Sequence, residues 1–256
     1  MIHVSALVLL LLFSAYGVVA ESPEGSAEII VGSLNVHYVT NQQEELAWEM
    51  RKEAVAAALH EGSPDIMAFQ EMETFEGGHF SRRNVQLSFL RRRFPSYEFA
   101  ALGDPEHYPS TQPVMYRREL FEAVDQGFFF FSETPDRIYS EPWVGGFPAF
   151  CSWVRFKDIA RGDHFYVYNL HFDYGSRKNR LLSANLVAQR IRERSHREEP
   201  VIVVGDFNAP WFFAPVRRIA ETGLKVANTT GSTVHFYRGI NILPAIDHLL
   251  HSPHFE

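Results

Sequence analysis

Four apolar runs that resemble β-strands end in a carboxylate, an amide or an imidazole, and a fifth run begins with a carboxylate. Carboxylate and amide oxygens are the ligands that Mg²⁺ and Mn²⁺ prefer. An imidazole can donate a proton to a leaving oxygen or bind a phosphoryl oxygen. The residues are Asn35 in VGSLNVHY, Glu71 in AFQEM, Asn169 and His171 in YNLHFD, Asp206 and Asn208 in VVGDFNAP, and Asp247 in AIDHLL. Together they suggest metal-assisted chemistry on phosphate.

No member of this set is specific by itself. Asn35 or Glu71 alone would more often be a turn former or a solvated strand end, and His171 alone would more often be a structural histidine. The signal is the order of these polar strand ends along one chain, which the surrounding fold must bring together.

Runs with strand character account for most of the chain, and no repeat or linker divides it. Strands are expected over residues 29–38, 65–71, 97–102, 113–118, 121–131, 150–157, 165–172, 201–204 and 247–251. Many strands with only a few helices predict two packed β-layers flanked by helices.

Three helices are expected between these strands. Asn41 and Glu44 resemble a capping box that opens the first, in which Leu46, Met50, Ala54 and Ala58 recur every four residues. The others are expected over residues 84–93 and 177–194.

The chain of 256 residues is 46% hydrophobic and 21% charged, which suits one large domain with a sizeable core. Its net charge is −7. An acidic chain is poorly suited to hold nucleic acid by charge alone, because that affinity comes from Lys and Arg at the phosphates. A metal ion in a carboxylate site can still attract phosphate.

The first twenty residues have the features of a secretory signal peptide. Their apolar run, residues 6–13, is too short to span a bilayer, and Val18-Val19-Ala20 places compact residues at a cleavage position before Glu21. We therefore expect a signal peptide over residues 1–20, a short spacer over 21–27, one domain over 28–256, no stable membrane span and a secreted or periplasmic location. The alternative is an uncleaved anchor or a buried segment.

Other kinds of reaction centre find little support. Cys151 is the only cysteine and lies in an apolar run, which indicates a buried, inert thiol and excludes an intrachain disulfide. Twelve histidines invite a zinc site, but no HExxH or paired His-Cys spacing is present. The chain also lacks a Gly-x-Ser-x-Gly elbow and a P-loop.

Five motifs stand out along the chain: SLNVHY, DIMAFQE, NLHFD followed by Arg180, GDFNAP and residues 233–247. In these motifs the chain resembles the endonuclease/exonuclease/phosphatase superfamily. SETPD followed by Trp143, and the stretch Thr233-Val234-His235-Phe236, look most like its small bacterial branch. The resemblance covers the chain from about Ile29 to its end. It implies a DNase I-like α/β (α+β) fold, a four-layer sandwich of two mixed β-sheets flanked by helices.

The resemblance also implies roles for the residues that match its motifs. Asn35 and Glu71 would bind the divalent cation, Mg²⁺ or Mn²⁺. Three residues would be catalytic: Asp206 orients or deprotonates the attacking water, His171 stabilises the phosphoryl group or assists the leaving oxygen, and Asp247 orients a histidine further on or lies near a second metal.

Three further residues would bind phosphate by the same resemblance, namely Asn169, Asn208 and Arg180. For Arg180 a solvated helix face is an equally good interpretation, because the residue lies nine positions after His171 within a predicted helix.

Two departures from the family pattern bear on activity. The family closes with a Ser-Asp-His segment on a final strand, and none occurs before Glu256, so we expect either a truncated chain without its last strand or a crippled enzyme. Ser110, with Gln112 nearby, stands where many relatives carry a glutamate that partners the histidine.

The main hypothesis is an exported, monomeric Mg²⁺- or Mn²⁺-dependent hydrolase of phosphate esters. Its rival is a non-catalytic relative that uses the same cleft to bind a phosphorylated or lipid ligand. The sequence does not separate nucleic acid, phospholipid and sugar phosphate as substrates.

Overall fold

The computed structural model describes residues 3–8, 28–39, 47–72, 84–228, 231–233 and 243–255. These residues form two mixed β-sheets. The first sheet has the strand order β1 (His3–Val8), β2 (Glu28–Asn35), β3 (Ile66–Gln70), β5 (Val114–Arg117), β4 (Tyr97–Ala100). The second has the order β10 (Lys225–Val226), β11 (Asp247–His251), β9 (Val201–Asp206), β8 (His164–His171), β7 (Phe150–Asp158), β6 (Phe121–Phe130).

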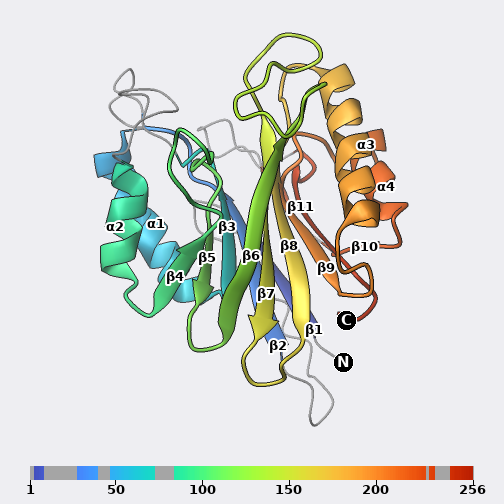
Figure 1. The fold of residues 1–256 in the computed structure, drawn as a ribbon. Coiled ribbons are helices and arrows are strands. Elements are labelled where there is room, and N and C mark those ends of the chain that lie inside the picture. The colour runs from blue at the N-terminus through green and yellow to red at the C-terminus, as the bar shows by residue number, and fades with distance from the viewer. Residues whose placement is uncertain are drawn as a thin grey trace.

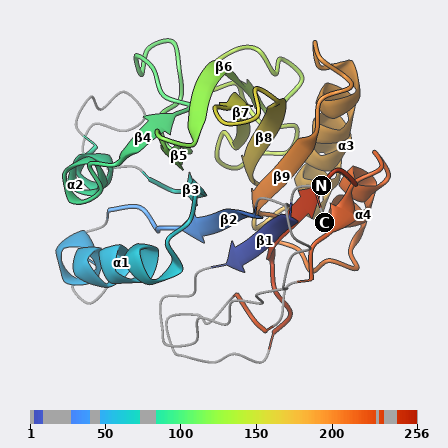
Figure 2. The same cartoon turned by 90° about the horizontal axis from the view of Figure 1, so that it is seen from below.

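Four helices cover the outer faces of the two sheets: α1 (Trp48–Gly62), α2 (Val85–Arg93), α3 (Arg177–Glu193) and α4 (Ala214–Ala220). Helices α1 and α2 lie against the first sheet, and α3 and α4 against the second, as Figures 1 and 2 show. Three apolar clusters fill the spaces between these layers, one of them between the two sheets. The predicted four-layer sandwich is confirmed.

Side-chain alternation along the strands separates the central core from the outer ones. In β9, Ile202 and Val204 face the other sheet, whereas Val201 and Val203 face α3 and α4. Because successive side chains of a strand point to opposite faces, Asp206 must lie on the same face as Ile202 and Val204. The same parity places Asn169 and His171 of β8 between the sheets, since Phe165 and Val167 lie there. The space between the sheets is thus apolar along most of its length and polar at one end.

The predicted helices and strands agree with the structure to within a few residues. For the first helix, the prediction was partly wrong about which face is buried. Helix α1 begins at Trp48, after an N-cap at Ala47 without a side-chain hydrogen bond, and the expected capping box at 41–44 lies outside the described residues. Met50 and Ala54 are exposed, so the predicted stripe was wrong at these two positions, whereas Ala58 packs against the core and Leu46 lies outside the described residues. Trp48, Val55 and Leu59 are buried instead, because these larger side chains supply more apolar surface to the sheet.

Two elements were not predicted. Helix α4 has only seven residues and begins with a proline in its first turn. Strand β10 has two residues that pair with β11. Both are too short to show a periodic pattern in the sequence.

Strand β1 consists of residues assigned to the leader from the sequence, and it pairs in parallel with β2 (Figure 2). Removal of residues 1–20 would make β2 an edge strand of the described sheet. The signal peptide, the export and the further strand expected after residue 256 all stay predictions. None of the helices in the described ranges has the length and apolar character needed to cross a bilayer.

Candidate active site

The polar strand ends predicted from the sequence meet at one end of the space between the sheets. Strand β2 runs parallel to β3, and β8 runs parallel to β9, so their carboxyl ends lie together. Strand β11 is antiparallel to β9, and therefore its first residue, Asp247, stands opposite Asp206. His171 stands opposite Asp206 on the other side.

Two nitrogen atoms lie between the carboxylates of Glu71 and Asp206. The Asn35 amide Nδ2 donates to Oε1 of Glu71 at 2.9 Å and to Oδ2 of Asp206 at 3.2 Å. The His171 Nε2 lies 3.8 Å from Oε1 of Glu71 and 3.7 Å from Oδ2 of Asp206. Two carboxylate oxygens from different sheets therefore face one shared space.

His37 is a member of this cluster that sequence reasoning missed. Its Nδ1 lies 3.2 Å from Oε2 of Glu71. Its backbone carbonyl accepts hydrogen bonds from Arg51 of α1 and from Gln86 of α2, which fix the segment after β2. His37 stands in the motif SLNVHY, but it has a φ of 53°, so strand alternation does not apply to it.

Glu71 is ionised at neutral pH. Burial acts to raise its pKa, but the hydrogen bond with His37 and the charge of His171 outweigh burial and lower the pKa to about 2. The backbone N–H of Tyr38 and the Asn35 amide also donate to this carboxylate.

Asp206 and Asp247 are buried, and their pKa values are raised, whereas that of Glu71 is lowered. Burial raises the pKa of Asp206, and the nearby His171 offsets only part of this effect. Burial, and then the neighbouring Asp206, raise the pKa of Asp247 well above its usual range. The hydroxyl oxygen of Thr233 accepts the backbone N–H groups of Ile246 and Asp247 and fixes the start of β11.

The turn after β9 holds Asp206 and Asn208 in place. A side chain at Gly205 would put its Cβ 2.0 Å from the Leu170 carbonyl oxygen, so only glycine fits beside β8. The Asn208 N–H donates to Oδ1 of Asp206 at 2.8 Å, and the Asn208 side chain donates to the Phe172 carbonyl at 2.8 Å. The glycine-led GDFN motif thus builds one rigid turn.

Backbone strain is concentrated at this site. Six non-glycine residues in the described part of the chain have positive φ, and three of them are His37, Glu71 and Asn208. Such conformations cost free energy and persist only where the surrounding contacts hold them, which is common at functional sites.

Asn169 does not reach this open cluster, and its predicted contact with phosphate does not fit the structure. The side chain is fully buried. Its Oδ1 accepts from Gln70 at 2.7 Å, and its Nδ2 donates to the carbonyls of Phe69 and Gln112 at 2.8 and 3.1 Å. No atom of the amide is left for a ligand, because Asn169 joins the two sheets. Gln112 belongs to the same buried network, since it donates to the carbonyls of Phe150 and Asn169.

Arg180 lies at the start of α3 and is 9% exposed, so the alternative of a solvated helix face is wrong. Its guanidinium donates to the carbonyls of Asp173 and Tyr174, both at 2.8 Å. Arg180 thereby shapes the loop that follows His171. A direct contact with phosphate stays a prediction.

The donor set of the cluster fits a hard divalent cation. Glu71 is anionic and its side chain is 24% exposed, and Asp206 supplies a second carboxylate oxygen. Asn35 turns its amide nitrogen toward these oxygens, while its Oδ1 accepts the His37 N–H at 3.0 Å. Ligation through the Asn35 oxygen therefore requires the amide to rotate.

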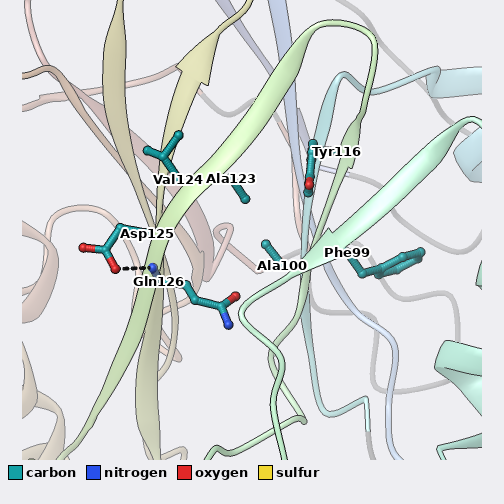
Figure 3. Close-up of a pocket in the computed structure, with 7 residues that line it drawn as sticks. All are labelled: Phe99, Ala100, Tyr116, Ala123, Val124, Asp125 and Gln126. Atoms are coloured by element: carbon teal, nitrogen blue, oxygen red, sulfur yellow. Dashed lines mark hydrogen bonds between the residues drawn. The ribbon is translucent and has the colours of Figure 1, made fainter.

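Two other features of the described residues lie apart from this site. His196, Glu198 and Glu199 have potential ligand atoms within 4.8 Å of one another, but Glu199 already accepts two hydrogen bonds from Arg155. A cavity of about 420 Å³ is lined by residues of β4, β5 and β6 (Figure 3). None of the predicted site residues lines this cavity.

The two packed mixed sheets and the polar cluster at one end of them support the class of phosphoester hydrolases. The endonuclease/exonuclease/phosphatase family model matches residues 32–256. The chain belongs to this family, in agreement with the resemblance seen in the sequence. None of the curated proteins searched matches the chain.

Solved structures with the same fold include a mannosyl-6-phosphatase from Bacteroides thetaiotaomicron, with 26% identity over 87% of this chain and 85% of that chain and a TM-score of 0.72. An endonuclease/exonuclease/phosphatase from Bacteroides vulgatus has 24% identity over 86% of this chain and 85% of that chain, with a TM-score of 0.71. The human Nocturnin catalytic domain, with 17% identity, 86% and 80% coverage and a TM-score of 0.58, shares the fold.

Proposed function

We propose that the protein is an exported, Mg²⁺- or Mn²⁺-dependent hydrolase of phosphate esters, and that phosphomonoesters of sugars are its substrates. One observation carries the proposal of hydrolysis: carboxylates from both sheets, Glu71 and Asp206, face one space that His171 and Asn35 also line. The family membership supports a phosphorylated substrate. The similarity to a mannosyl-6-phosphatase supports the sugar.

The residues divide the reaction between the two sheets. Glu71 and, after rotation of its amide, Asn35 would hold the cation on the first sheet. A cation bound there supplies positive charge that neutralises the phosphate. On the second sheet, Asp206 accepts a proton from the attacking water, and its raised pKa suits a general base. His171 stabilises a phosphoryl oxygen or donates a proton to the leaving oxygen.

Asn208 is suited to hold a phosphate oxygen from the turn beside Asp206. Its amide nitrogen donates to Phe172, and its strained backbone fixes the position of the side chain. Asp247 stands behind Asp206 and keeps a second buried carboxyl in the centre. Burial and the neighbouring Asp206 raise the pKa of Asp247, which weakens its negative charge beside the substrate phosphate.

The test is phosphate release from mannose 6-phosphate by the purified chain with Mg²⁺ or Mn²⁺, with and without EDTA. Hydrolysis should disappear with EDTA, and both Glu71→Gln and Asp206→Asn should lower it at least ~100-fold. The matched control is Asp136→Asn, an exposed carboxylate paired with Arg190 of α3, which should leave the rate unchanged.

Mn²⁺ binding, measured by calorimetry on the same variants, separates the two hypotheses. Weaker Mn²⁺ binding by Glu71→Gln, together with lost hydrolysis, supports the enzyme. Hydrolysis that survives both substitutions shows that these residues do not carry the reaction. Tight binding of mannose 6-phosphate without any hydrolysis favours the non-catalytic relative.

A further inference from the structure

The exposed aromatic side chains of the described residues gather in three loops near the candidate active site. The side chains exposed by more than a third are Phe147, Tyr174, Trp211, Phe212 and Phe213. Tyr174 follows His171 by three residues, and Trp211 follows Asn208 by three residues. The other large apolar side chains exposed in these ranges are aliphatic or Met. The loops that carry Tyr174 and Trp211 therefore begin at the strand ends that carry His171 and Asp206.

Hydrogen bonds tie the loop that carries Tyr174 to the loop that carries Trp211. The Phe172 N–H donates to the Asp206 carbonyl at 2.9 Å, and the Asn208 side chain donates to the Phe172 carbonyl. Arg180 holds the carbonyl of Tyr174 itself. These bonds fix both loop backbones beside the reacting groups.

The third loop is held by α3. Asn179 donates to the carbonyls of Val144 and Gly145 and accepts the Val144 N–H. The same amide donates to Asp173 at 2.7 Å, which connects this loop to the one that carries Tyr174. The loop between β6 and β7 includes Val144 and Gly145. In Figure 1 this long yellow-green loop lies at the upper end of the molecule, beside the start of α3.

The rings remain exposed, although those of residues 211–213 contact one another. Tyr174 is 79% and Trp211 is 59% exposed. Trp211 packs edge-to-face on Phe212 with 5.7 Å between ring centroids, and Phe212 packs on Phe213 at 5.1 Å. Exposed aromatic surface costs hydration free energy, so a gathered group of this kind indicates a binding surface.

The charge of these loops limits what they can bind. Residues 143–147, 172–176 and 207–213 contain no Lys or Arg. Their one charged residue, Asp173, accepts hydrogen bonds from Gly175, Ser176 and Asn179. Nucleic acids and anionic membranes are held through Lys and Arg. Arg177 and Lys178, both exposed, follow the second of these stretches directly at the start of α3. The rings themselves suit a neutral group with an apolar face, and a pyranose has such a face in its C–H bonds.

We propose that Tyr174 and Trp211 bind the sugar ring of a sugar phosphate whose phosphate group lies at Glu71, His171 and Asp206. This inference rests on the proposed function and names the residues that select its substrate class. The two rings contribute affinity for the sugar and take no part in the chemical step, so they are specificity residues.

The experiment compares mannose 6-phosphate with glycerol 3-phosphate, a phosphomonoester without a ring. In Trp211→Ala and Tyr174→Ala, the ratio of kcat/KM for the sugar ester to that for the ringless ester should fall about tenfold, the effect of losing one apolar ring contact. The fall should appear in KM for the sugar ester. Trp211→Phe and Tyr174→Phe, which keep a ring, should restore most of it.

Ile159→Ala is the matched control, because Ile159 is 49% exposed on the turn between β7 and β8, outside the three loops. An unchanged ratio in both alanine variants overturns the inference. An equal fall for both esters also overturns it, since the rings would then act through the fold. If the alanine variants lose more affinity for phosphatidylcholine vesicles than for the sugar ester, the rings contact a membrane. If they lose more kcat/KM for adenosine monophosphate than for the sugar ester, the rings contact a base.

Binding of mannose 6-phosphate to Asp206→Asn, measured by calorimetry, separates this inference from the proposed function. Binding that weakens when Trp211→Ala is added supports the aromatic contact even where the unsubstituted chain hydrolyses nothing, a result that would overturn the proposed function alone. Equal affinity of Asp206→Asn with and without Trp211→Ala overturns the aromatic contact alone.

Discussion

Two polar regions lie next to each other between the sheets, and they differ in whether their hydrogen bonds are complete. The first, here called the amide layer, contains Ser33, Gln70, Gln112, Ser152 and Asn169, all buried. Every one of these side chains has a protein partner: Ser33 bonds to Gln70, Gln70 to Asn169, and Ser152 and Asn169 to the Gln112 carbonyl. The layer is neutral and saturated, so it can join the sheets but cannot take a ligand.

The candidate active site begins two residues further along β2 and β8, at Asn35 and His171, and directly after Gln70 of β3, at Glu71. There Glu71 carries charge and Asp206 supplies a second carboxylate, and His171 stands 3.7 Å or more from both, too far for a strong hydrogen bond. The side chains of Glu71 and His171 are also partly exposed. The comparison shows how one interface provides both support and chemistry: a satisfied layer fixes the sheets, and the incomplete layer above it has capacity left for a cation and a phosphate.

Glu71→Gln breaks this comparison most strongly, because it makes the open site resemble the amide layer. A neutral amide can replace the carboxylate in the bonds with Asn35 or His37, but it cannot supply a negative charge to a cation. Hydrolysis should fall at least ~100-fold, and the free energy of unfolding should fall by about 1–2 kcal/mol, because the lowered pKa of Glu71 shows that its native contacts favour the charged carboxylate. The measurements are phosphate release and urea unfolding. Hydrolysis that stays near the unsubstituted rate while stability falls would mean that Glu71 is mainly structural.

The converse substitution is Asn169→Leu in the amide layer. It leaves the Gln70 amide and the Phe69 carbonyl without their partner, and buried polar groups without partners cost about 1–3 kcal/mol each. Urea unfolding should show a loss of roughly 2–3 kcal/mol. Gln189→Leu is the control, because that exposed amide bonds only to Glu193 on the same helix. Equal stability of the two variants would contradict the role given to the amide layer.

Alternation along the strands explains how much of this arrangement the sequence could predict. Asn35, Asn169, His171 and Asp206 all occupy positions whose parity faces the other sheet, so their convergence followed from the strand pattern and the family motifs. Parity did not reveal that Asn169 is sealed while His171 is open. That difference depends on depth between the sheets, which only the packing of both sheets determines.

His37 and the rings of the three loops escaped prediction for a different reason. His37 leaves β2 with a positive φ, and the loops follow no period at all. Their positions come from contacts between distant segments, such as the Arg180 bond to Tyr174 and the Asn179 bonds to Val144. Such contacts leave no regular pattern in one sequence.

His248 sharpens the comparison, because it is a buried side chain that supports the open site from the opposite face of β11. It is 1% exposed, and its Nε2 donates to the Ala209 carbonyl at 2.8 Å. Its ring also packs edge-to-face on Phe207, at 5.3 Å. His248 therefore positions the turn that carries Asp206 and Asn208.

Replacing His248 should alter activity more than stability. His248→Phe removes the bond to Ala209 but also removes the Nδ1 atom, which has no hydrogen-bond partner among the described residues, so the two effects on stability offset each other. We expect kcat to fall about tenfold with KM little changed, since a misplaced base affects the chemical step. His248→Gln, which can still donate to Ala209, should recover part of the rate. Equal kcat values for His248→Phe and the unsubstituted chain would show that the turn holds without this bond.

The smallest effect is expected at Arg155 and Glu199, a charged pair on β7 and in the loop before β9, at the end of the sheet away from the site. Unlike the active-site carboxylates, Glu199 has its charge matched by two hydrogen bonds from one guanidinium. The hydrogen bond from Arg155, only partly opposed by burial, lowers the pKa of Glu199 below its usual value. A lowered carboxyl pKa stabilises the fold above the unfolded-state value of about 4.3, and this contribution is lost as the pH falls through the lower folded-state value.

Glu199→Gln should therefore lower the free energy of unfolding by about 0.5–1 kcal/mol at pH 7, and the difference from the unsubstituted chain should vanish at acid pH. Glu221→Gln, in the more exposed pair with Arg218, should have a smaller effect at either pH. Urea unfolding at both pH values measures these differences. A deficit of Glu199→Gln that stays the same in acid would mean that the geometry of the side chain, and not its charge, stabilises this end of the sheet.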